Sequence, residues 1–121
     1  MSYIKGNVTE QQKSNHGSLT GCFFEKDSLK YDQAVEINFS ALPTGFSAPK
    51  HLHSKSKTWV IVIKGKMIFK LDNHLVDVNA GEFIIFPAGT PEEVVSVDPE
   101  TENITLHSPC IPGGDKVTII D

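Results

Sequence analysis

The chain has 121 residues, enough for one hydrophobic core and too few for two domains. Hydrophobic residues make up 39% and charged residues 21%, which excludes a largely disordered chain. The formal net charge is −4, all 11 basic residues are lysines and they form no patch or stripe, so no nucleic-acid partner is expected.

The N-terminal stretch, residues 1–17, is polar and lacks the apolar core of a signal peptide. The longest apolar run, residues 59–63, is too short to cross a bilayer. Cys22 and Cys110 do not form a disulfide framework, and neither has a histidine or an acid at a diagnostic spacing. We therefore expect a cytoplasmic protein with no membrane span, and a peripheral N-terminal segment over residues 1–20.

Short extended segments follow one another along the rest of the chain. Residues 35–40 alternate apolar and polar side chains, which is the period of a half-buried strand. After a turn at 42–45, the β-branched and aromatic run 58–63 favours a strand over a helix. Gly65 marks the next turn, and residues 66–71 are the expected returning strand.

Turn residues separate the later strands in the same way. Asp72 and Asn73 tolerate positive φ, so a tight hairpin is expected between 66–71 and the next strand. No stretch of helical length shows a convincing 3.6-residue period. Many short strands punctuated by glycine and proline predict an all-β sandwich or closed barrel. The remaining strands are expected at 74–78, 82–86, 92–97, 103–108 and 116–120.

The strand 58–63 is apolar on both of its faces. Val60 and Val62 share one face and the larger side chains that alternate with them share the other, so both faces should be covered. One face would line the barrel. The other requires a cover, either the segment around Phe23 and Phe24 or a second subunit, and we expect a homodimer.

His51 and His53 are two residues apart on an expected strand, so their imidazoles project to the same side. Neutral imidazole is a common ligand for zinc, iron, manganese and nickel, and the pair suits two nitrogen ligands on one divalent ion. Histidines at this spacing also occur as hydrogen-bonded or exposed pairs without a metal. The spacing by itself favours a pair without a metal.

The residues around this pair resemble the two sequence motifs of cupins. Residues 45–65 follow the spacing G-x5-HxH-x4-E-x6-G, with Thr58 at the glutamate position. Residues 81–96 follow the spacing G-x5-PxG-x2-H-x3-N, with Glu92 at the histidine position. The end of the chain, residues 106–117, also resembles the tail of single-domain cupins. The matched positions are Gly45, His51, His53, Gly65, Gly81, Pro87 and Gly89.

The resemblance implies a cupin-type jelly-roll β-barrel, with residues 1–121 forming a single cupin domain. The ligand site would lie inside the barrel and would be reached from one open end. In cupins the metal is held by the two histidines and the glutamate of the first motif and by the histidine of the second.

Carried over to this chain, only His51 and His53 are matched ligands. Thr58 is a poor ligand because its hydroxyl is neutral, whereas Glu92 brings a carboxylate to the position of the missing histidine. The expected metal site is therefore His51, His53 and Glu92, a set that zinc hydrolases and non-haem iron oxygenases also use. Thr58 and His107 are expected in the pocket or in contact with the ligands.

Two functions follow from different classes of protein. The first is a metal-dependent enzyme of the oxygenase or isomerase type, acting on a small organic acid, sugar or aromatic compound. The second is a metal-free module that binds or senses a small ligand. The retained histidines favour the first, and the lost glutamate and the absence of another acid–base group on the motif strands favour the second. No catalytic base is assigned, and the metal and the substrate are left open.

Overall fold

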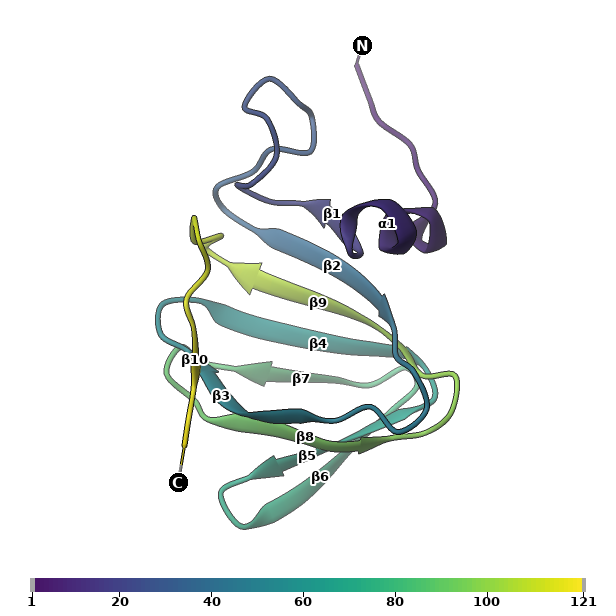
Figure 1. Ribbon diagram of the computed structural model, residues 1–121, viewed down its shortest axis with the longest axis vertical. Helices are drawn as coiled ribbons and strands as arrows, with labels where there is room; N and C mark the ends of the chain where they lie inside the picture. The colour runs from purple at the N-terminus through teal and green to yellow at the C-terminus, as the bar shows by residue number, and fades with distance from the viewer. Residues whose placement is uncertain (1, 121) are drawn as a thin grey trace.

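The structure is a computed structural model that describes residues 2–120. Its strands are β1 (Ser18–Thr20), β2 (Glu36–Ala41), β3 (Ala48–His53), β4 (Lys57–Lys64), β5 (Lys66–Leu71), β6 (His74–Asn79), β7 (Phe83–Phe86), β8 (Glu92–Val97), β9 (Glu102–Ser108) and β10 (Lys116–Thr118). Within these residues they form two five-stranded sheets, ordered β1-β2-β9-β4-β7 and β10-β3-β8-β5-β6. The sheets face each other around one interior (Figure 1). The predicted all-β jelly-roll fold is confirmed.

Every segment that the sequence predicts as a strand is a strand, and no end differs by more than two residues. The hairpin between β5 and β6 is also as predicted. Leu71 pairs with His74, which leaves Asp72 and Asn73 as a two-residue turn, and Asp72 adopts a φ of 55°.

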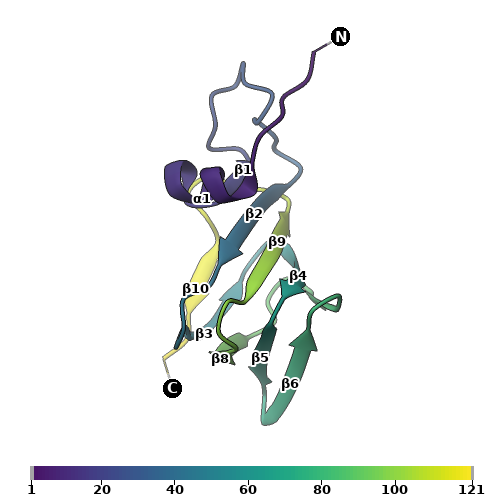
Figure 2. The ribbon, with the colours of Figure 1, turned by 90° about the vertical axis from the view of Figure 1, so that its right-hand side faces the viewer.

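The structure also contains a short helix that no sequence pattern indicated. This helix, α1 (Val8–Asn15), begins where the Asn7 side chain accepts hydrogen bonds from the backbone N–H groups of Thr9 and Glu10. No side chain of α1 is buried, so the helix lacks the apolar stripe that a 3.6-residue period detects. It packs against β1 and β2 at one end of the barrel, away from the β5–β6 hairpin (Figure 2).

The apolar core lies between the two sheets, and β4 shows how the sequence builds it. Val60 and Val62 point inward and are buried. The side chains of Ile61 and Ile63 alternate with them on the outer face, where they are exposed. The other buried members of the core come from β5 to β8: Met67, Phe69, Val78, Phe86 and Val94.

Glycines in positive-φ turns position the motif strands. Gly45, Gly65, Gly81 and Gly89 all have φ between 80° and 86°. At Gly65 a side chain would also clash with its surroundings, because an added Cβ would lie 2.8 Å from the Cα of Thr101. The Gly89 N–H donates to the carbonyl of His53 at 2.8 Å, so the turn of the second motif holds the end of the strand that carries the first.

Candidate metal centre

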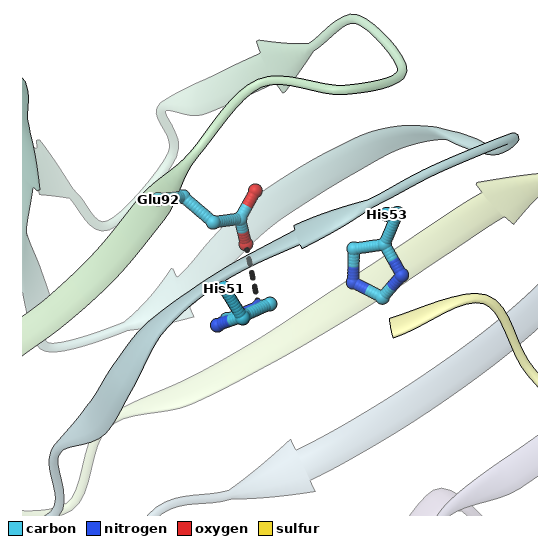
Figure 3. Close-up of side chains that lie close together, drawn as sticks. All are labelled: His51, His53 and Glu92. Carbon is cyan, nitrogen blue, oxygen red and sulfur yellow. Dashed lines mark ion pairs between the residues drawn. The ribbon is translucent and has the colours of Figure 1, made fainter. Parts of the chain in front are cut away.

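Two neighbouring strands bring two imidazoles and a carboxylate together. His51 and His53 lie on β3, and Glu92 begins β8 directly opposite His51 in the antiparallel ladder. His51 Nε2 is 3.3 Å from Glu92 Oε1 (Figure 3). One potential ligand atom from each of the three residues lies within 4.8 Å of the others. This spacing is close enough for one ion to contact all three.

An irregularity in β3 orients these side chains. Ala48 pairs with Val94 and His51 pairs with Glu92, so three steps along β3 match two along β8 and the register shifts by one residue. Such a bulge puts Ala48 and His51 on the same face, although residues three apart on a regular strand face opposite ways. His53, two residues further on, lines the same cavity.

Both imidazoles are held through their Nδ1 atoms. His51 Nδ1–H donates to the carbonyl of Pro49 at 2.8 Å, and His53 Nδ1–H donates to Asp115 Oδ1 at 3.1 Å. When Nδ1 carries the proton of a neutral imidazole, Nε2 keeps its lone pair. Metal-binding histidines typically donate their second nitrogen to an oxygen in this way.

Asp115, just before β10, contacts a candidate ligand, and no sequence motif pointed to it. Its carboxylate also accepts the backbone N–H groups of Lys55 (2.9 Å) and Ser56 (2.8 Å). Burial alone would raise the pKa of Asp115, but hydrogen bonds from Lys55, His53 and Ser56 outweigh it and hold the pKa at about 2. Asp115 stands 62 residues from His53, so no local pattern links them.

Thr58 and His107 form a second polar pair beside the cluster. They lie opposite each other on β4 and β9, with Thr58 Oγ1 2.9 Å from His107 Nδ1. The His107 ring centroid is 4.4 Å from that of His53. Burial, together with the charge of the neighbouring His53, lowers the pKa of His107 and favours its neutral form. Both residues line the cavity, and the Thr58 hydroxyl is engaged with His107.

Glu92 and burial act in opposite directions on the pKa of His51. The hydrogen bond that the His51 ring donates to the Glu92 carboxylate raises the pKa of His51, against the opposing effect of burial. Glu92 itself is buried, and a buried carboxylate is stable only with a partner. His51 is that partner in this structure, and a divalent cation is the other kind of group that satisfies a buried carboxylate.

The cluster opens into a cavity of about 280 Å³ between the sheets. This volume is close to the lower end of the roughly 300–1,000 Å³ typical of small-molecule pockets. The cavity combines the three candidate ligands and Lys116 with apolar side chains: Leu42, Phe46, Val60, Met67, Phe69 and Val94. The arrangement can hold one ion and a small ligand beside it.

The fold is similar to solved structures of low sequence identity. A conserved protein with a double-stranded β-helix domain from Klebsiella pneumoniae has a TM-score of 0.70 and 15% identity, over 99% of this chain and 100% of that one. Pac13 from Streptomyces, a nucleoside dehydratase, has a TM-score of 0.67 and 16% identity, over 98% of this chain and 92% of that one.

The DMSP lyase DddQ from Ruegeria pomeroyi has a TM-score of 0.63 and 17% identity over 73% of this chain. The match covers 44% of the lyase, so the chain spans less than half of that protein. No curated protein matches this sequence. At these identities the similarities show the fold alone. The model of the cupin domain family matches residues 38–105, more than half of the chain, and the chain therefore belongs to the cupin domain family.

Proposed function

We propose that this protein is a metal-dependent cupin in which His51, His53 and Glu92 hold one divalent ion that acts on a small organic molecule in the barrel. The observation that carries the proposal is the set of three candidate ligand atoms within 4.8 Å of one another in the wall of a cavity between the sheets. In the proposal residues 1–121 function as a single domain.

The donor set fits a first-row divalent ion. Two imidazoles and one carboxylate suit zinc, iron, manganese or nickel, and they leave coordination positions open. A bound ion would supply Lewis acidity toward an oxygen atom of the ligand. The chain's own contribution is orientation, since Pro49 and Asp115 hold the two rings.

The size and polarity of the cavity support a small, oxygen-bearing ligand. Its volume of about 280 Å³ leaves room for only a small molecule. Lys116 lines the cavity that contains the cluster, and its positive charge would attract an anionic ligand. The similar folds of a DMSP lyase and a nucleoside dehydratase are consistent with an enzyme of this kind.

A metal-free binding module is the second candidate, and Thr58 favours it. Thr58 occupies the position of the cupin glutamate, and its neutral hydroxyl is engaged with His107. The Glu92 carboxylate has His51 as a partner without any ion. In this case the barrel would bind its ligand through hydrogen bonds and apolar contacts alone.

Metal titration separates the two candidates. Zinc, manganese and anaerobic ferrous iron are titrated into chelator-stripped protein by calorimetry, with His51→Ala and Glu92→Gln as test variants. His74→Ala is the control, because this exposed histidine on β6 lies outside the cluster. One ion should bind per wild-type and control chain, and the test variants should lose that binding. If the wild type binds none of these ions saturably, the metal centre is excluded and the metal-free module is the remaining candidate.

We also propose that the protein is a homodimer, formed through the outer face of β4 and β7. Ile61, Ile63, Phe83 and Ile85 are all exposed there, and Phe83 reaches 65%. A cluster of large apolar side chains on one face is typical of an interface. Light scattering should give twice the chain mass of 13.3 kDa, and Phe83→Lys should give a monomer. A monomeric wild type at micromolar concentration would exclude the dimer.

A further inference from the structure

The oxygen of a buried side-chain amide in the barrel wall lacks a hydrogen-bond partner. Asn103 lies on β9 with 5% of its surface exposed, and it lines the cavity. Its Nδ2 donates to Thr105 Oγ1 at 3.2 Å. Among residues 2–120, Asn103 Oδ1 is the one buried side-chain polar atom without a partner.

An unpaired buried acceptor destabilises the folded protein, and an apolar side chain of similar size would avoid that cost. Buried polar atoms of this kind are found where a ligand or an ordered water supplies the missing hydrogen bond. The position of Asn103 in the cavity wall makes a cavity ligand the natural partner.

Two of the cavity-lining side chains next to Asn103 on its own sheet are polar but uncharged. Ser40 pairs with Asn103 across the β2–β9 ladder, and Ser40 and Thr105 line the same cavity. The apolar side chains of Met67 and Phe69 come from the other sheet. Ser40, Asn103 and Thr105 therefore form a polar strip, and it contains no charge to pair with an ionic group.

The polar strip and the metal cluster lie at different levels of the barrel. Asn103, Thr105 and His107 alternate along β9, and all three line the cavity. His107 contacts His53 of the cluster, whereas Asn103 is four residues away, about 13 Å along the strand. A ligand that extends from the cluster toward Asn103 needs a polar group at each end.

We infer that Ser40, Asn103 and Thr105 form a subsite for a hydroxyl group and that the ligand of this barrel is a small hydroxylated carboxylic acid. The inference rests on the proposed metal centre, since the carboxylate binds at the ion beside Lys116. The hydroxyl at the other end binds Asn103. A hydroxyl both donates and accepts, so it satisfies the amide whichever of Oδ1 and Nδ2 faces it.

Matched acids with and without the hydroxyl test the subsite. The pairs are 4-hydroxybutanoate with butanoate, 5-hydroxypentanoate with pentanoate, and 6-hydroxyhexanoate with hexanoate. Each acid is titrated by NMR into the full chain, both zinc-loaded and stripped. At least one hydroxy acid should bind more tightly than its parent, by about 5- to 100-fold, because the parent leaves the amide unpaired.

Asn103→Leu should abolish this preference and leave the affinity for the parent acid unchanged. It should also leave the ligand-free protein at least as resistant to heat as the wild type, because it removes an unpaired polar atom. Asn73→Leu, in the exposed β5–β6 turn, is the control and should keep the preference.

The outcomes separate the subsite from the metal centre. If zinc does not bind in the titration, the proposed metal centre is wrong. The ratio of affinities within each pair of acids tests the subsite, and it can be measured in stripped protein as well. No hydroxy acid binding more tightly than its parent would overturn the subsite and indicate that water completes Asn103. The subsite would also be wrong if Asn103→Leu lowered the affinity for the hydroxy acid and for its parent equally.

Discussion

Asp115 joins the chain's end to the candidate metal ligands, so Asp115→Asn should weaken both the fold and the metal site. The wild-type carboxylate accepts hydrogen bonds from Lys55, Ser56 and His53, and 7% of its side chain is exposed. Its pKa is lowered from 3.8 to about 2. At 1.36 kcal/mol per pH unit, this shift corresponds to about 2 kcal/mol of folding free energy at pH 7.

The pH dependence has a defined sign. Because the folded-state pKa of Asp115 lies below its unfolded value, the stabilisation is complete above about pH 5. It is lost as the pH falls through 3.8 toward about 2, where the folded carboxylate takes up its proton. The difference in unfolding free energy between wild type and Asp115→Asn should therefore shrink from about 2 kcal/mol at neutral pH toward zero.

Urea denaturation in the presence of chelator, at pH 7, 5, 4 and 3, measures this difference without any contribution from a metal. The thermal midpoint should also fall by about 8 °C at pH 7, at roughly 4 °C per kcal/mol for a domain of this size. Asp77→Asn, at an exposed position on β6, is the matched control and should change stability by less than about 0.5 kcal/mol.

A zinc titration of the same variant tests the link to the metal site. Loss of the carboxylate that orients His53 should weaken zinc binding by about 10- to 100-fold. A stability difference below about 0.5 kcal/mol at pH 7, or one that stays constant down to pH 3, would refute the electrostatic reasoning.

Two further predictions concern packing and thiol chemistry. Gly81→Ala should destabilise by about 1–2 kcal/mol through its positive φ alone, and Gly65→Ala by about 1–3 kcal/mol more because its Cβ meets the Thr101 backbone. Equal urea midpoints for the two variants would contradict this. Burial, with a contribution from Cys22, raises the pKa of Cys110 to about 12, so iodoacetamide at pH 8 should label Cys110 only after unfolding. Rapid labelling of the native protein, seen by mass spectrometry, would be the opposite result.

The positions of the strands could be predicted because local patterns determine them. Alternation along residues 35–40 and the β-branched run at 58–63 correspond to β2 and β4, and the turn residues separate the strands where expected. The helix α1 escaped prediction because it buries nothing, so its sequence carries no apolar period.

The candidate site could be predicted only in part. The resemblance to the cupin motifs predicted one site with His51, His53 and Glu92. In the structure the pairing of β3 with β8 puts their ligand atoms close together. The partners of those side chains depend on a one-residue bulge in β3 and on Asp115 near the chain's end. Neither feature has a local pattern.

The sequence by itself therefore determined the periodicity of each strand, the turns between strands and the residue types available for chemistry. The tertiary structure decided which polar groups find partners: Asp115 holds His53, Thr58 is engaged with His107, and the Oδ1 atom of Asn103 is left without a partner. The physical reason is that periodicity depends on neighbouring residues, whereas hydrogen-bond partners come from strands that pair across long separations in the chain.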